Sequence, residues 1–100
     1  MGYKDRALSA PQAAIDDPQS SELIRAWVAA KELQCSIRLG VWDDPGAWGK
    51  VLADVARQIA AGVEARDEIP RQQTLDRMVK IFVNEFTSSG PAGSEAGRGG

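Results

Sequence analysis

The sequence contains no histidine and only one cysteine, Cys35, among its 100 residues. Without histidine, the chain lacks the commonest general base and the commonest metal ligand of proteins. A single thiol forms no disulfide within the chain and no zinc site made of cysteines alone. These absences predict a protein that is not an enzyme, with no catalytic residues, no metal site and no cofactor.

The sequence also lacks a large excess of either positive or negative charge. Fourteen Asp and Glu residues against 12 Lys and Arg residues leave a net charge of −2, and residues 22–86 hold nine basic and ten acidic side chains. Such a balance provides no basic surface for phosphates, which argues against nucleic acid as a partner. No apolar run approaches the ~18 residues of a membrane helix, and residues 1–6 lack the apolar segment of a secretory signal. The expected location is the cytoplasm, whose reducing conditions suit a lone thiol.

The composition divides the chain into three segments. Residues 1–21 hold two prolines and scattered apolar residues, which predicts an irregular N-terminal arm. Residues 22–86 are predicted to form a single α+β domain. Residues 87–100 hold five of the ten glycines and no large apolar side chain. This composition predicts a disordered tail, because nothing in it offsets the entropy of ordering.

Residues 23–41 decide the fold class. In each of two expected strands, alternate residues are apolar. If the strands pair antiparallel so that the numbers of paired residues have an odd sum, the apolar residues of both strands lie on one face of the hairpin. This pattern is typical of a half-buried antiparallel pair, and it predicts that Cys35 is a buried residue of the apolar face. The residues of that face are Ile24, Ala26, Val28, Ala30, Leu33, Cys35, Ile37, Leu39 and Val41.

A helix over residues 21–32 is the alternative. Residues 29–32 are good helix formers, and the Ala-Lys-Glu-Leu segment lacks the Gly or Asn that favours a tight hairpin turn. Local propensity therefore favours the helix, whereas the matching apolar faces favour the hairpin. We expect the hairpin, with helix-strand-helix-helix as the alternative architecture.

Two further helices are predicted. Asp44 followed by Pro45 is typical of a helix start, with Asp43 and Asp44 as cap residues, and this helix is expected to end near Ala65. The second helix is expected over residues 71–86. The predicted fold is small α+β: an antiparallel hairpin followed by two helices packed on its apolar face. The expected apolar stripes are Trp48, Val51, Leu52, Val55, Ile59 and Val63, then Leu75, Met78, Val79, Phe82 and Phe86.

Several short motifs resemble a known family. They are Arg-Ala-Trp-Val at 25–28, Cys-Ser-Ile-Arg at 35–38, Trp-Asp-Asp-Pro-Gly-Ala-Trp-Gly at 42–49 and Leu-Ala-Asp-Val-Ala-Arg at 52–57. Residues 22–61 resemble a family of short bacterial proteins classed as a domain of unknown function. The resemblance implies no activity and no site residues. We associate the position after Arg57 with histidine in relatives, and this chain has Gln58 there.

Two groups of residues are candidate binding sites. Arg25, Trp27 and Arg38 lie on the open face of the expected hairpin, where they form a patch for an acidic partner or a solvated face. Trp42 and Trp48 flank the helix start, where they form either a small-anion pocket or a packed cap.

The predicted function is a non-enzymatic protein-interaction or regulatory module. A domain of about 65 residues is marginally stable alone and a two-stranded hairpin has open edges, so we expect a homodimer and an unidentified protein partner. The alternative is a binder of small anionic ligands near Trp42 and Trp48. A remote alternative is a carrier, because the terminal Arg-Gly-Gly resembles the tails of ubiquitin-like and sulfur-carrier proteins.

Overall fold

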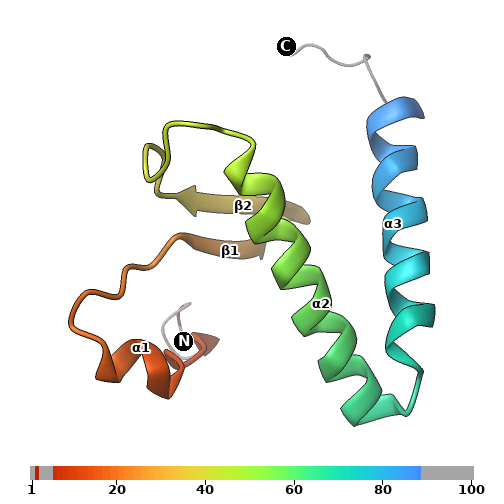
Figure 1. Cartoon of the computed structure of the whole chain (residues 1–100), viewed down its shortest axis with the longest axis horizontal. Coiled ribbons are helices and arrows are strands. Elements are labelled where there is room, and N and C mark those ends of the chain that lie inside the picture. Colours follow the sequence, from red (N-terminus) through yellow and green to blue (C-terminus); the bar gives the residue numbers. More distant parts are fainter. Residues whose placement is uncertain (1, 3–5, 89–100) are drawn as a thin grey trace. The chain divides into compact units, whose positions relative to one another are not determined.

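The computed structural model describes Gly2 and residues 6–88. The chain forms two compact units, Met1–Asp43 and Asp44–Gly100, and each is described by itself. The first contains helix α1 and strands β1 and β2, and the second contains helices α2 and α3 (Figure 1). A hairpin followed by helices confirms the predicted α+β class. Two predictions involve both units at once and therefore stay predictions. They are the packing of the helices on the hairpin and the single domain over residues 22–86.

Strands β1 (Ile24–Ala29) and β2 (Glu32–Ile37) pair antiparallel. Their register places Ala29 opposite Glu32, so paired residue numbers have the odd sum that the apolar pattern requires. The hairpin interpretation is therefore confirmed, and the helix over 21–32 is wrong. The apolar cross-strand pairs on one face are Ile24 with Ile37, Ala26 with Cys35, and Val28 with Leu33.

A two-residue turn joins the strands. Ala30 and Lys31 have φ angles of 55° and 65°, and positive φ at both central residues is what a type I′ hairpin turn requires. For residues other than Gly, this left-handed conformation costs about 1–2 kcal/mol per residue. The sequence therefore places an unfavourable turn here, and the apolar cross-strand pairs outweigh its cost.

Cys35 is exposed, which corrects the expectation that it is buried. Among the described residues of the first unit, the strands contact one another and no further element packs against them. Val28 and Leu33 of the same face are 80% and 69% exposed. Alternation in the sequence predicts which residues share a face, but burial requires a second layer.

The N-terminal arm is less irregular than predicted, because Gln12–Asp16 forms the short helix α1. Pro11 precedes it, and the Pro11 carbonyl accepts hydrogen bonds from the N–H groups of Ala14 and Ile15. After the helix, Ser20 Oγ donates to the Ala14 carbonyl at 2.7 Å. The predicted tail starts at residue 87, but α3 continues to Ser88. Residues 89–100 lie outside the described residues.

Helix α2 (Ala47–Asp67) begins two residues later than Pro45. The Asp44 carboxylate accepts the Gly46 N–H at 2.8 Å, and the Asp44 carbonyl accepts the Ala47 N–H at 3.0 Å. Asp44 therefore closes a turn in front of the helix, while Gly46 is its N-cap and forms no side-chain cap bond. The acidic residue satisfies a backbone donor before the helix rather than within its first turn.

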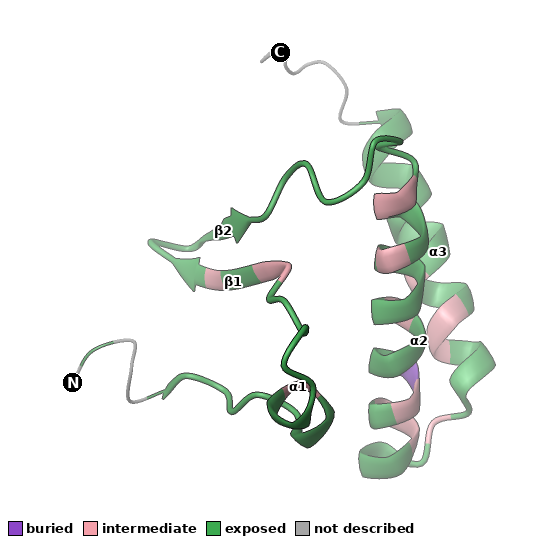
Figure 2. Ribbon diagram, turned by 60° about the vertical axis from the view of Figure 1, so that its left-hand side comes forward, coloured by how far each residue is buried: buried purple, intermediate pink, exposed green. Residues whose placement is uncertain are grey.

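Helices α2 and α3 (Arg71–Ser88) form an antiparallel pair (Figure 1). Glu68 ends α2 with φ of 62°, and its N–H donates to the Glu64 carbonyl at 2.9 Å. Ala60, in the middle of α2, has no exposed surface and is the only fully buried hydrophobic residue in the described part of the chain (Figure 2). A small side chain at the contact lets two helices approach closely.

The predicted stripe of α2 is only partly covered, since Trp48, Val51 and Val63 are half-buried. Leu52, Val55 and Ile59 are all more than 40% exposed. On α3, Leu75 and Met78 are half-buried as predicted, whereas the later members of its stripe are exposed. At 100° per residue, Ala56 and Ala60 lie roughly 90° around α2 from the large apolar stripe. Ala60 is therefore the most deeply buried position of the helix pair, and half of the predicted α2 stripe remains exposed.

Glu64 connects the ends of the two helices. Arg71 Nε donates to Glu64 Oε1 at 2.5 Å, and the Arg71 N–H, at the start of α3, donates to Oε2 at 3.4 Å. The hydrogen bond from the Arg71 side chain lowers the pKa of the Glu64 carboxyl below its ordinary value. This pair closes the turn and satisfies a backbone donor that the helix leaves open.

We expect Glu64→Gln to lower stability slightly at neutral pH and to have no effect in acid. Because the folded-state pKa of Glu64 is lowered, its contribution is present above the ordinary carboxyl pKa and is lost as the pH falls through the folded value. Both side chains are exposed, so the effect is small. Urea unfolding of both proteins from about pH 7 to about pH 2 measures it. A difference that stays constant across this range would contradict the role of the pair.

Candidate functional site

The second face of the hairpin carries polar and aromatic side chains. The register places Arg25 opposite Ser36 and Trp27 opposite Gln34. Arg38 continues the alternation beyond β2, where its N–H donates to the Leu23 carbonyl at 2.8 Å. We call these residues (Arg25, Trp27, Gln34, Ser36 and Arg38) the polar face. The three residues predicted as a patch, Arg25, Trp27 and Arg38, thus share one face of the sheet.

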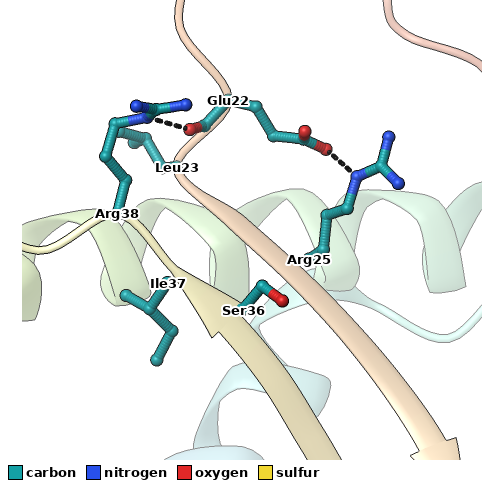
Figure 3. Close-up of a pocket in the computed structure, with 6 residues that line it drawn as sticks. All are labelled: Glu22, Leu23, Arg25, Ser36, Ile37 and Arg38. Atoms are coloured by element: carbon teal, nitrogen blue, oxygen red, sulfur yellow. Dashed lines mark hydrogen bonds and ion pairs between the residues drawn. The ribbon is translucent and has the colours of Figure 1, made fainter.

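Glu22 organises one end of the polar face (Figure 3). Arg25 Nε donates to Glu22 Oε2 at 2.7 Å, and Arg38 Nε donates to the Glu22 carbonyl at 2.9 Å. Both arginines therefore approach the same residue, one through its side chain and one through its backbone. Together they border an open pocket of about 280 Å³, which is lined by Glu22, Leu23, Arg25, Ser36, Ile37 and Arg38.

The groups that line this pocket are suited to binding an acidic group. Two guanidinium groups and one hydroxyl offer hydrogen-bond donors to an acidic group, while the Glu22 carboxylate offsets one of the two positive charges. The side chains of Arg25 and Glu22 are each about half exposed, so their ion pair adds little stability. The arrangement fits weak recognition of an acidic segment better than tight capture of a small anion.

A second hollow covers the rest of the polar face. It measures about 740 Å³, and its lining includes Gly2 and Arg6 of the N-terminal arm. The two hollows share Arg25 and Ser36. The lining residues are Gly2, Arg6, Arg25, Trp27, Val28, Ala29, Gln34 and Ser36.

The other predicted site residues are divided between the two units. Trp42 is exposed and, with Asp43, ends the first unit. Asp44 begins the second unit, and Trp48 is a half-buried residue in the first turn of α2. A ligand pocket formed by the two tryptophans stays a prediction. The terminal Gly-Gly of the carrier hypothesis lies outside the described residues.

Sequence reasoning missed a surface on the helix pair. An apolar groove of about 280 Å³ runs between α2 and α3 near the ends that are distant from their connection. Small residues at intervals of three and four on α2 were the signal, because they leave a hollow beside larger neighbours. The groove is lined by Gly49, Leu52, Ala53, Ala56, Met78, Val79 and Phe82.

Two features are absent from the described residues. No three His, Cys, Asp or Glu side chains among them come together as a group that could hold a metal ion. None of the helices in residues 6–88 has the length and apolar character needed to cross a membrane.

Comparison with known families identifies the chain. The model of a domain of unknown function, DUF5076, matches residues 7–89. The chain belongs to this family. The match extends beyond residues 22–61, on which the resemblance was based, in both directions. The Trp-Asp-Asp-Pro-Gly-Ala-Trp-Gly box as a family hallmark and a bacterial origin stay predictions.

A solved structure has the same fold as this DUF5076 chain. It comes from the photosynthetic bacterium Rhodopseudomonas palustrus and is named there a "putative pyruvate dehydrogenase". The two chains share 24% identity with a TM-score of 0.66, over 91% of this chain and 92% of that one. At this identity the likeness concerns the fold alone. No curated protein matches the chain.

Proposed function

We propose that this DUF5076 chain is a non-enzymatic protein-interaction module that acts as a homodimer. The observation that carries the proposal is the exposure of its large apolar side chains. Ala60 alone is fully buried among the hydrophobic residues of the described segments, while each unit by itself leaves an apolar surface uncovered. Small domains bury little surface and are only marginally stable alone, and exposed apolar patches are typical of association sites.

The sequence supports a role without catalysis. Cys35 is exposed, but no histidine is present in the chain to activate it as a nucleophile. The proposed setting is the bacterial cytosol, where a lone exposed thiol stays reduced. Turnover of a metabolite by the purified protein that disappears in Asp43→Asn or Asp44→Asn would contradict this part of the proposal.

The polar face supports a second interaction, with an acidic segment of another protein. Arg25 and Arg38 border one pocket, and Ser36 lies between them on the sheet as a further donor (Figure 3). Exposed arginines at the rim of an interface determine which partner binds and how fast, more than how tightly. Within the hairpin, this surface is the face opposite the apolar cross-strand pairs.

The homodimer is tested by sedimentation equilibrium of the full chain at ~100 µM, since micromolar affinity is ordinary for interfaces of this size. We expect a mass near twice the 10.7 kDa of one chain, and an unchanged dimer at high salt because the exposed contacts are apolar. A monomer at this concentration would contradict the proposed dimer.

A further inference from the structure

The apolar groove between α2 and α3 has the properties of an interface. Its lining includes no charged residue. Its rim remains in contact with solvent, since Val79 and Phe82 are 58% and 53% exposed. Beyond it, Phe86 is 72% exposed and packs edge-on against Phe82, with ring centroids 4.8 Å apart. A hollow bordered by a ridge of aromatic rings is thus present on one helix pair.

Resting on the proposed homodimer, we propose that a second copy of this chain docks its own α2–α3 pair on this groove. In a two-fold arrangement, one pair supplies the ridge and receives the ridge of its partner. The hollow is open at Gly49, where an added Cβ would meet no atom within 4 Å. The aromatic ridge of one copy therefore fills the space left by the small residues of the other.

The spacing of the exposed residues fits this arrangement. Intervals of three and four residues are typical of helices whose side chains interlock with a partner, as in four-helix bundles. On α2, this spacing places Val55 and Ile59 on the same side of the helix as Leu52, and Leu52 lines the groove. The six exposed residues of the two stripes are Leu52, Val55, Ile59, Val79, Phe82 and Phe86.

The area and the charge both match a second copy. Each of these six side chains leaves roughly 80 Å² exposed, which sums to about 500 Å². A stable dimer buries about 800 Å² per partner, of which about 65% is apolar. Helix α2 carries three basic and three acidic side chains, and α3 carries three and two. Two such helix pairs, with a net charge of +1 each, meet with little repulsion, and nothing in this charge pattern favours a strongly charged partner.

The test replaces Gly49 by Glu in the full chain. Glu is a better helix former than Gly and is favoured near a helix N-terminus, so the variant keeps its own helix while placing a charge in the groove. Phe86→Glu removes the ridge instead. Ala65→Glu is the matched control, because Ala65 is exposed on the same helix, about 24 Å along it from Gly49, outside the groove and roughly 120° around the helix from Ile59.

Sedimentation equilibrium and far-UV circular dichroism are measured on all four proteins. We expect Gly49→Glu and Phe86→Glu to raise the dimer dissociation constant by about 100-fold with unchanged helix content, and Ala65→Glu to leave it unchanged. Dimers of wild-type strength in both groove variants would overturn this interface and leave the homodimer standing. A monomeric wild-type protein would overturn both. Loss of helix in the groove variants would show that the chain itself covers the groove, which also overturns the proposal.

Discussion

Replacing Ala60 by Asp should unfold the α2–α3 pair. Ala60 has no exposed surface, and a buried carboxylate without a partner costs about 3–5 kcal/mol. That amount is comparable to the whole stability of a small domain, which is about 5–15 kcal/mol and lies at the low end for so short a chain. Far-UV circular dichroism and thermal unfolding measure the loss of helix, which should be nearly complete at 25 °C.

Ala65→Asp is the matched control for this prediction. Ala65 lies on the same helix but is exposed, so the variant only loses helix propensity and places a carboxylate unfavourably near the helix C-terminus, together about 1 kcal/mol. Equal destabilisation by the two variants would contradict the central place of Ala60 in the helix pair. It would show that the helices tolerate polar groups at their contact.

Replacing Ala30-Lys31 by Asn-Gly should stabilise the hairpin by about 2 kcal/mol. Both residues have positive φ, and Asn-Gly is the preferred pair for this turn because Gly adopts such angles without steric cost. A two-stranded hairpin is marginal in water, so a gain of this size changes its population strongly. Hydrogen exchange of the β1 and β2 amides measures it, and protection should rise about 30-fold.

The opposite effect is expected for Ala30→Pro. Proline holds φ near −65°, whereas the turn needs 55° at this position, so the amide protection of both strands should be lost. Lys31→Ala keeps the strained backbone and serves as the control, with protection as in the wild-type protein. Protected strands in Ala30→Pro, or loss of protection in the Asn-Gly variant, would contradict the observed turn.

The turn also shows how far local sequence predicts structure. Residues 29–32 favour a helix by propensity, and they form the end of a strand, a turn and the start of another strand. The correct prediction came from a longer pattern, the matching faces of the two strands. Short-range preferences amount to tenths of a kcal/mol per residue, whereas several cross-strand pairs together contribute more.

The site was predicted in part for the same reason. Alternation alone puts Arg25, Trp27 and Arg38 on one face. The register places Arg25 and Trp27 there, and the hydrogen bond from the Arg38 N–H to the Leu23 carbonyl continues the pairing. Glu22, which holds both arginines, was missed because a hydrogen bond from Arg38 to its carbonyl joins residues 16 positions apart. The groove between the helices was missed because an apolar stripe does not show which of its residues meet the neighbouring helix.

The missing histidine, the single cysteine and the near-balance of charges are properties of the sequence alone. They exclude a histidine base, a disulfide within the chain and a strongly basic surface. Periodicity also determined the hairpin, its register and two amphipathic helices, because side-chain direction repeats every 2 and 3.6 residues. Only the tertiary structure decided that Cys35 is exposed and that Ala60, rather than a larger residue, lies at the helix contact. Burial depends on what packs against a face, and periodicity holds no information about the layer that covers it.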